Sequence, residues 1–414
     1  QFFEMTTTKT TDVCTIAQMS EQGVYPSDEQ RHSFAKRLLT WFELHGRHGL
    51  PWQYHHQPSA DIYAVWVSEI MLQQTQVVTV LKFFEPFLAR FATVQELAVA
   101  DWQEVASFWA GLGYYARARN LHAGAQQVAD FIDTHGRFPE TVNEWQAVKG
   151  VGRSTAGAIV AMGVKKFGVI CDGNVKRVLA RHRAVCGDIT KSATDKRLWE
   201  IATALTPKEY SGHYAQAMMD LGATICTRTQ PKCHLCPVTD DCIAYALGVQ
   251  SQLPVKKKAP PKPHWHSIAL SLTHCGLTLW LHRQNGGGIW DGLWSLPIFM
   301  LPLDDNQKLD NNTLSDAIFK AWQSDEKVHD LLHSQLIEIL PIPTQTLTAY
   351  LRHTLTHVHW HLYGMSICLN NSQFNQINQT LTGLGIDYLW TDTPYNLPLP
   401  AAMHKLLTLS NSSC

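Results

Sequence analysis

Four of the ten cysteines lie within one short stretch, CTRTQPKCHLCPVTDDC, residues 226–242. They are Cys226, Cys233, Cys236 and Cys242, with the spacing C-x6-C-x2-C-x5-C. Disulfides suit small secreted domains that lack a core, and a chain of 414 residues is not one. Four thiolates can instead hold one zinc ion or one four-iron, four-sulfur (4Fe-4S) cluster. Zinc ribbons usually pair two C-x2-C knuckles and this stretch has one, so the spacing favours the 4Fe-4S cluster, with zinc as the alternative.

Two carboxyl side chains have settings in which they could act on a glycosidic bond. Asp172 stands in VICDGNVKRVLAR at the predicted N-cap of a basic helix, and Glu69 stands in the apolar helical stretch WVSEIMLQQTQV. Glycosidic cleavage commonly uses one carboxyl as an acid and a second that stabilises the cation. An N-cap aspartate is often only a cap, and Glu69 is either a solvated surface residue or a buried acid with a raised pKa. The sequence leaves these alternatives open.

A glycine-containing turn in VKGVGRSTAGAIVAMG, residues 148–163, predicts a hairpin between two helices. Gly150 and Gly152 are expected to permit positive φ and a close approach of the backbone to another surface. Free amides at the start of the next helix suit a phosphate, so the turn fits a helix–hairpin–helix that binds the DNA backbone. A plain αα-hairpin is the alternative. Residues 149–183 contain eight Lys and Arg residues and one acidic residue. This local positive charge favours contact with DNA phosphates, and a solvated helix face is the alternative.

The surrounding sequence predicts two folded parts. Residues 1–27 are Thr-rich and polar and are expected to be a disordered leader, with Met5 as a candidate start. Residues 28–250 show helical spacing of apolar residues nearly throughout. Residues 251–264 form a basic, Pro-rich linker, and residues 265–414 read as a smaller α/β part.

In that second part, residues 266–284 and 354–369 alternate apolar and polar residues as strands do, and short helices are predicted at 314–323 and 401–410. The chain has 45% hydrophobic residues and no apolar run of membrane-spanning length, which excludes a membrane-spanning protein. Its net charge of −1 does not mark a nucleic-acid binder, so any such function must depend on local charge.

Several motifs together resemble the endonuclease III superfamily, and within it the MutY-type adenine DNA glycosylases. They are WVSEIMLQQTQV, GLGYYARARNLH, GVGRSTAGAI, DGNVKRVLAR, QAMMDLGATICT and the four cysteines. The resemblance runs from about Phe34 to Cys242 and continues into the second part. It implies an all-α helix–hairpin–helix glycosylase domain with a 4Fe-4S loop at 226–242, followed by a smaller α/β Nudix-like domain. The expected reaction is hydrolysis of the N-glycosidic bond of adenine mispaired with 8-oxoguanine or guanine.

The resemblance implies roles for individual residues. Glu69 matches the general acid that protonates the departing adenine, Asp172 the carboxylate that stabilises the oxocarbenium ion, and Asn174 a residue that positions the sugar and that carboxylate. The residues matched to substrate or DNA binding in this helical part are Trp52, Gln53, Leu72, Gln74, Tyr114, Gly150, Gly152, Ser154 and Gln216. Among them, Trp52 and Gln216 match the adenine pocket, Leu72 and Gln74 the gap left by a flipped base, and Tyr114 an aromatic wedge beside the oxidised guanine.

Ser154 separates two classes within the superfamily. Bifunctional members carry a lysine at this hairpin position, which attacks the sugar and leads to strand cleavage. A serine hydroxyl cannot form a Schiff base, so a monofunctional glycosylase that leaves an abasic site is expected. The alternatives are a bifunctional lyase for oxidised pyrimidines and, in a different class, a non-enzymatic iron–sulfur protein that binds DNA or transfers electrons.

The second part carries GGGIWDGLWSLPIF, which resembles the Nudix-like domain of the same family, but no Nudix box with its metal-binding glutamates. The resemblance therefore implies recognition of 8-oxoguanine without pyrophosphate hydrolysis. Leu355, Thr356 and His357 stand where the family usually has Phe-Ser-His. The histidines nearby at 353, 357, 359 and 361 are expected to serve surface hydrogen bonding rather than metal binding. The expected partner is double-stranded DNA with the mispair, bound by a monomer in the cytoplasm, near the bacterial nucleoid.

Overall fold

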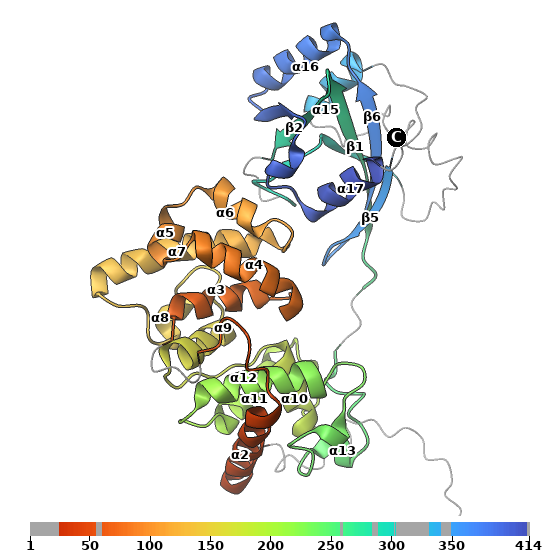
Figure 1. Ribbon diagram of the computed structural model, residues 1–414. Coiled ribbons are helices and arrows are strands. Elements are labelled where there is room, and N and C mark those ends of the chain that lie inside the picture. Colours follow the sequence, from red (N-terminus) through yellow and green to blue (C-terminus); the bar gives the residue numbers. More distant parts are fainter. Residues whose placement is uncertain are drawn as a thin grey trace, which may run out of the picture. The chain divides into compact units, whose positions relative to one another are not determined.

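The computed structural model describes residues 25–54, 60–256, 260–283, 289–301, 303, 331–340 and 349–411. The predicted leader up to residue 24, linker residues 257–259 and the predicted helix at 314–323 lie outside the described residues. The chain forms two compact units (Figure 1). One comprises Gln1–Val99 and Arg119–Ala259, and the other Ala100–Ala118 and Pro260–Cys414. Among the described residues, no helix is both long enough and apolar enough to cross a membrane.

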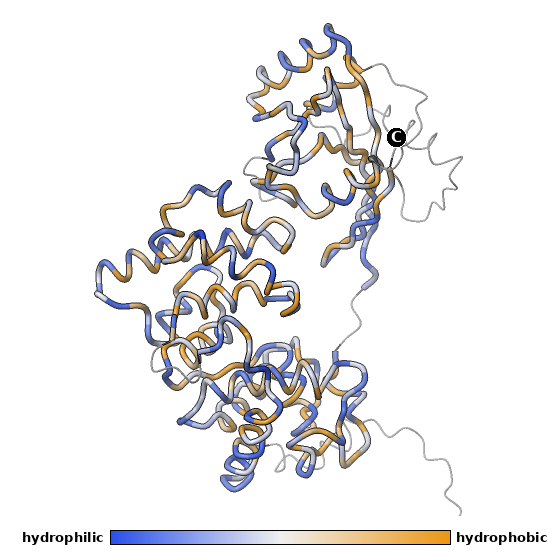
Figure 2. The backbone as a smooth tube through the Cα atoms, in the orientation of Figure 1, coloured by the Kyte–Doolittle hydropathy of each residue, from blue (hydrophilic) through white to orange (hydrophobic). Residues whose placement is uncertain are grey.

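The first unit is helical, as the sequence predicts (Figure 1). Its α-helices are α2 (Asp28–His45), α3 (Ile62–Leu72), α4 (Val77–Arg90), α5 (Val94–Val99), α7 (Tyr115–His135, which begins in the other unit), α8 (Val142–Gln146), α9 (Arg153–Ala158), α10 (Gly173–His182), α11 (Ser192–Leu205), α12 (Ser211–Asp220) and α13 (Ile243–Ala246). Short π- and 3-10 turns are η2 (Ile159–Val164), η3 (Leu221–Ile225) and η4 (Cys233–Leu235). Apolar and polar residues alternate along most of these helices (Figure 2), so each can bury one side.

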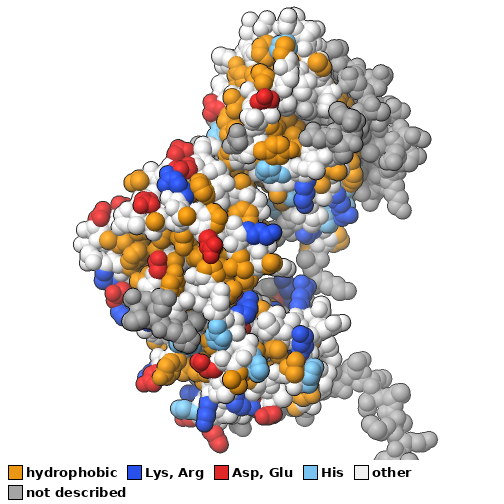
Figure 3. Space-filling view, viewed as in Figure 1, with side chains coloured by type: hydrophobic (Ala, Val, Ile, Leu, Met, Phe, Trp, Pro, Cys, Tyr) orange, Lys and Arg blue, Asp and Glu red, His pale blue; other side chains and the backbone are white. Residues whose placement is uncertain are grey.

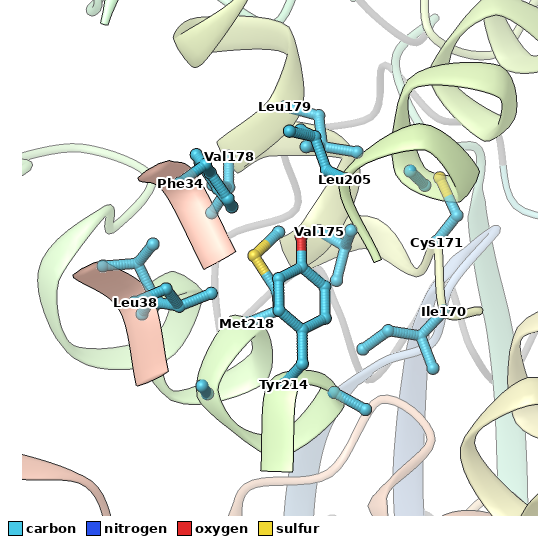
Figure 4. Packing of buried hydrophobic residues seen from close by; sticks show 14 of the residues in the cluster. Phe34, Leu38, Ile170, Cys171, Val175, Val178, Leu179, Leu205, Tyr214 and Met218 are labelled. Carbon is cyan, nitrogen blue, oxygen red and sulfur yellow. The ribbon is translucent and has the colours of Figure 1, made fainter. Parts of the chain in front are cut away.

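One buried cluster joins α2, α10 and α12 (Figure 4). Phe34 and Leu38 of α2 lie in it with Val178 of α10 and Met218 of α12, all almost fully buried. Each such side chain contributes about 1.5–3 kcal/mol when it is buried fully. The cluster therefore fixes α10 and the residue before it, Asp172, relative to the rest of the unit.

The continuous helical pattern from residue 61 to residue 91 is interrupted in the structure. Helix α3 ends at Leu72, α4 begins at Val77, and Gln74 between them has a φ of 57°. The left-handed region costs a non-glycine residue about 1–3 kcal/mol, so packing must hold this turn. The interruption matters because it places several polar side chains beside the cavity described below.

The second unit contains a mixed sheet. Its described strands are β1 (His264–His274), β2 (Leu277–His282), β3 (Trp294–Ser295), β4 (Ile298–Leu301), β5 (Ala349–Thr354), β6 (His359–Cys368) and β7 (Tyr388–Thr391). The order is β3-β2-β1-β6-β5, with β4 paired to β1 and β7 to β2. Strands β1 and β6 run parallel, with Ile268 opposite Tyr363, and the other pairs are antiparallel. The strands predicted at 266–284 and 354–369 are confirmed.

Alternate residues of β1 contribute to two separate cores. Ile268 and Leu270 lie in a cluster with residues of α15 (Leu331–Ile339) and α16 (Asn371–Gly383). Ala269 lies in another cluster with residues of α17 (Ala401–Asn411), which confirms the predicted C-terminal helix. The unit also holds α6 (Trp102–Trp109) and the short turn η5 (Pro394–Asn396). The predicted smaller α/β part is thus a sheet with helices on both faces.

Candidate active site

A cavity of about 690 Å³ opens where the end of α3, the turn after it, α9 and the start of α10 meet. Predicted site residues that line it are Glu69, Leu72, Gln74, Ser154, Asp172 and Asn174. A second cavity of about 580 Å³ shares Glu69, Leu72, Asp172 and Asn174 with the first and adds Trp52 and Gln216. Because the two cavities share these walls, they form one cleft. The fold thus brings together eight of the residues singled out in the sequence.

Glu69 is the acidic residue of the otherwise apolar helix α3, and its side chain lines both cavities. Burial raises the pKa of Glu69 to about 8, and the negative charge of Asp172 adds to the shift. A carboxyl group with this pKa keeps its proton at neutral pH and can act as a general acid. Glu69 is partly buried at the cleft, and of the two alternatives left open by the sequence the structure supports the acid with a raised pKa.

Asp172 is the N-cap of α10, as predicted, and its Oδ1 accepts a hydrogen bond of 2.8 Å from the amide of Val175. Burial raises the pKa of Asp172, whereas amide hydrogen bonds from Val175 and Asn174 and the positive charges of Arg177 and Lys176 oppose the rise. The helix N-terminus also favours an anion. The charge of Asp172 contributes to the raised pKa of Glu69, and Glu69 is the carboxyl that keeps its proton at neutral pH.

Asn174 is held by a residue that the sequence analysis did not select. The guanidinium of Arg177, one turn further along α10, donates to Asn174 Oδ1 at 3.0 Å, to the carbonyl of Gly222 at 2.7 Å and to the carbonyl of Cys226 at 2.8 Å. These bonds tie the start of α10 to the start of the cysteine loop. The i, i+3 spacing from Asn174 was the available signal, but Arg177 had been counted only as part of a basic stretch.

The basic stretch 149–183 does not form a continuous exposed face. Arg181 and Arg183 are buried, Lys176 pairs with Asp195, and the guanidinium of Arg153 lies 3.9 Å from the centre of the Trp199 ring. On the side of the molecule shown in Figure 3, basic and acidic side chains are interspersed over the helical unit. The net charge of residues 149–183 therefore overstates how many exposed cations this segment has for binding phosphates.

The predicted hairpin joins α8 to α9, and its two glycines differ. Gly150 has a φ of 81°, and a Cβ there would lie 2.6 Å from the Cβ of Asn120, so glycine is required. The expected positive φ is wrong for Gly152, which caps α9 in an extended conformation with a φ of −83°. Nothing lies within 4 Å of a Cβ at Gly152, because this side of the turn is open.

Ser154, on the first turn of α9, accepts a hydrogen bond of 2.9 Å from the amide of Cys171 to its Oγ. This bond connects the hairpin helix to the residue that precedes Asp172. Ser154 thus lines the cavity and also helps to hold the backbone that carries the carboxylate.

The far wall of the cleft contains Trp52 and Gln216, both buried. Gln216 Nε2 donates to Asp220 Oδ1 at 2.9 Å, and Asp220 also accepts from the amide of Arg47 at 2.7 Å and from its Nε at 2.9 Å. The pair of half-buried Arg47 with buried Asp220 is a second feature that sequence reasoning missed. Gln53 does not line either cavity, since its side chain bonds to the carbonyl of Arg47 and the amide of Leu50 within its own turn.

Tyr114 belongs to the second compact unit and precedes α7. Its φ is 52°, its side chain is 49% exposed, and the Arg117 guanidinium lies 5.3 Å from the centre of its ring. From its sequence alone, an aromatic residue at this position could also be part of the hydrophobic core. The exposure excludes the core position and leaves a ring available at the surface.

Leu355, Thr356 and His357 form the connection between β5 and β6. Leu355 packs against the cluster beneath α17, while Thr356 and His357 are exposed. Lys262 donates to the carbonyl of Leu355 at 2.6 Å, and the ring of His357 lies edge-on to Trp265 at 5.8 Å. A leucine thus anchors the loop and leaves the two polar side chains outward.

All four loop cysteines are free thiols. Burial raises the pKa of Cys236 to about 12, and the charges of Cys226, Cys242 and Cys233 add to the rise. Among the described residues, no three His, Cys, Asp or Glu side chains are gathered for a single metal ion.

Arg181 connects α10 to this loop. Its Nη1 lies 3.4 Å from Cys226 Sγ and donates to the carbonyl of Thr227 at 2.7 Å, and its Nη2 donates to the carbonyl of Arg228 at 3.0 Å. Arg181 thus holds the start of the cysteine loop against α10.

Comparison with known proteins places these features in a family. A model described as HhH-GPD superfamily base excision DNA repair protein matches residues 67–204, and a NUDIX domain model matches residues 269–409. The adenine DNA glycosylase of Buchnera aphidicola subsp. Schizaphis graminum is 34% identical over 313 residues, which are 75% of this chain and 86% of that protein. The adenine DNA glycosylase of Rattus norvegicus is 40% identical over 252 residues, 60% of this chain and 48% of that protein.

Among solved structures, a thermostable thymine-DNA glycosylase is 25% identical with a TM-score of 0.46, covering 53% of this chain and 98% of that one. The predicted fold class is confirmed by the two matching domain models, and the predicted family by the relatives that share most of their length with this chain. The chain belongs to the adenine DNA glycosylases of the HhH-GPD superfamily.

Proposed function

We propose that this protein hydrolyses the N-glycosidic bond of adenine that is paired with 8-oxoguanine or guanine in double-stranded DNA, and leaves an abasic site. The main support for the proposal is a pair of carboxyl side chains that line one cleft. The pKa of Glu69 is raised to about 8, and the Asp172 carboxylate accepts a hydrogen bond from the backbone amide of Val175. Such a pair supplies a proton donor and an anion at neutral pH.

In this mechanism the adenine leaves the helix and enters the cleft between Glu69 and the wall formed by Trp52 and Gln216. Glu69 donates its proton to the base, which makes the base a better leaving group. Asp172 stabilises the positive charge that develops on the sugar, and water then adds. Asn174, held by Arg177, keeps the sugar and Asp172 in register.

The reaction stops at the abasic site because Ser154 stands at the hairpin position where a lyase carries lysine. Its hydroxyl already accepts the amide of Cys171, and a hydroxyl cannot form the imine that precedes strand cleavage. The open side of Gly152 and the amides that begin α9 suit a DNA phosphate. Leu72 and Gln74 fill the gap left by the base, and Tyr114 stacks beside the orphaned guanine.

Cys226, Cys233, Cys236 and Cys242 would hold a 4Fe-4S cluster. When bound, this group fastens the loop so that its basic residues can approach the DNA backbone, and it takes no part in breaking the bond. In the second unit, Thr356 and His357 recognise 8-oxoguanine, which differs from guanine by an oxygen at C8 and a hydrogen on N7. The Thr356 hydroxyl accepts that N7–H, and His357 donates to a nearby acceptor.

A duplex with one adenine opposite 8-oxoguanine tests the proposal, labelled on the strand that carries the adenine. We expect strand breaks after hot alkali and intact strands without it. Breaks without alkali would indicate a bifunctional lyase. Binding of the duplex without excision would indicate a non-enzymatic DNA-binding protein.

A further inference from the structure

Two acidic residues stand directly before the last cysteine of the loop, and one arginine from a distant part of the chain pairs with both. Arg37 of α2 places Nη1 3.2 Å from Asp240 Oδ2 and pairs through Nη2 with Asp241 Oδ1. Cys242 follows immediately in the sequence. This contact connects α2 to the end of the cysteine loop.

The two ion pairs differ in burial. The Asp240 side chain is 82% exposed, whereas Asp241 is 22% and Arg37 26% exposed. A solvent-exposed pair contributes little, because water screens it and two flexible side chains must be ordered. The Arg37–Asp241 pair is screened much less, so Asp241 is the acid that can hold the loop.

Asp241 also contacts α10. His182, the last residue of α10, is buried and places Nε2 3.2 Å from Asp241 Oδ1. Its ring packs edge-on against Phe34 of α2, with 4.7 Å between the ring centres. One carboxylate therefore joins the loop to the two helices that share the main core of the unit.

Cys242 caps α13 and is held by bonds to nearby residues, since its amide donates to the carbonyl of Thr239 at 3.1 Å and its carbonyl accepts from the amide of Ala246 at 3.0 Å. Its Sγ lies 3.8 Å from the carbonyl of Arg181, while Cys226 at the other end of the loop is surrounded by bonds from Arg177 and Arg181. A cluster with four thiolate ligands brings negative charge to the loop, and a carboxylate in the adjacent residue repels it unless a cation is close. Arg37 supplies that cation.

We propose that Arg37 and His182 are positioning residues that hold Asp241, and through it Cys242, in the place needed to retain the iron–sulfur cluster. This inference rests on the proposed 4Fe-4S cluster. The proposal predicts which substitution should weaken cluster retention more. Arg37→Gln removes the attachment and leaves the repelling charge, whereas Asp241→Asn removes both, so Arg37→Gln should harm retention more.

The experiment uses the purified full chain and measures iron per chain and the decay of the visible absorbance of the cluster in excess iron chelator. We expect Arg37→Gln to lose its cluster about threefold to tenfold faster than the parent, and Asp241→Asn to be intermediate. The double variant should decay no faster than Arg37→Gln alone, because the two side chains act through one contact. Far-UV circular dichroism before the challenge reports the fold.

Two matched variants serve as controls. Asp240→Asn removes the exposed acid of the same segment, and Arg31→Gln removes a second arginine of α2 that pairs with Asp28. Both should retain the cluster as the parent does. Parental decay in both Arg37→Gln and Asp241→Asn would overturn the inference, as would equally rapid loss in Asp240→Asn. If Arg37→Gln does not fold, the decay of the cluster absorbance is compared between Asp241→Asn and Asp240→Asn. Faster decay in Asp241→Asn supports the proposal, and equal decay overturns it. A parent protein without iron would overturn the cluster proposal and the positioning role with it.

Discussion

At the scale of single residues, the site depends on two carboxyl groups whose surroundings differ. Glu69 projects from an apolar helix, and burial keeps its proton in place. Asp172 caps a helix, where burial raises its pKa while the amide of Val175 and nearby cations oppose the rise. The same functional group thus has different surroundings at the two positions, which suits the proposed division into an acid and an anion.

Replacing Asp172 by asparagine should leave duplex binding intact and abolish excision. The amide can still cap α10, but it cannot stabilise a developing cation, and one such electrostatic contact is worth about 3–4 kcal/mol. Single-turnover excision and duplex binding should be measured on the same preparation. Excision within about tenfold of the parent would contradict the assigned role, since tenfold corresponds to only about 1.4 kcal/mol.

Excision should fall as pH rises through about 8, because the proton donor Glu69 loses its proton there. The sign follows from the raised pKa, since the active form is the protonated one and predominates below that value. Glu69→Gln should abolish excision while the helices and the cluster absorbance remain. A single-turnover pH profile from 6 to 10 checks the first point; a flat profile would require a different proton donor.

At the scale of elements, the hairpin between α8 and α9 and the helix α10 set the geometry of the cleft. Ser154 on α9 bonds to the amide of Cys171, and Arg177 and Arg181 on α10 bond to the cysteine loop. Each element is short, but their polar contacts converge on the backbone around Asp172. A substitution that breaks one of these contacts should therefore displace the backbone around Asp172 and move its carboxylate.

The two hairpin glycines allow a matched comparison. Gly150→Ala should destabilise the protein by about 2–4 kcal/mol, because it combines a left-handed φ with a contact of 2.6 Å to Asn120. Gly152→Ala should cost less than about 1 kcal/mol, since its φ is negative and the space beside it is open. Urea denaturation measures both.

Duplex binding separates folding from DNA contact at the same two positions. We expect Gly152→Ala to weaken binding although it folds normally, because the added methyl group occupies the space where a phosphate would approach. Normal binding by Gly152→Ala would remove this face of the hairpin from the DNA interface.

At the scale of the whole molecule, the chain combines a helical unit that carries the cleft with a sheet-containing unit that carries the exposed Thr356 and His357. The proposed reading of 8-oxoguanine and the proposed bond cleavage thus fall on residues of different units. Recognition of the lesion is therefore separable from bond cleavage by substitution.

Thr356→Ala combined with His357→Ala should slow excision opposite 8-oxoguanine much more than excision opposite guanine. Each lost hydrogen bond is worth about 0.5–1.5 kcal/mol, so the preference should fall by roughly tenfold to a hundredfold. Single-turnover rates on the two duplexes measure the ratio. Equal slowing on both would mean that the loop only holds DNA, and recognition would then be sought at Tyr114 and Gln74.

The sequence by itself determined the features that depend on local pattern. Helical and strand periodicity predicted the two folded parts, the residue before a basic helix predicted the cap at Asp172, and the cysteine spacing predicted one shared ligand site. Each of these follows from neighbours within a few residues, where backbone geometry and side-chain chemistry act directly. The family resemblance then supplied roles for residues that pattern could not relate to one another.

Only the tertiary structure decided which distant groups meet and how much water reaches them. It placed Glu69 and Asp172 at one cleft and raised the pKa of Glu69, it paired Arg47 with Asp220, and it buried basic residues that looked exposed as a charge run. It also showed that Gly150, and not Gly152, needs a left-handed backbone. Burial and pairing depend on packing between segments far apart in the chain, and no local pattern encodes them.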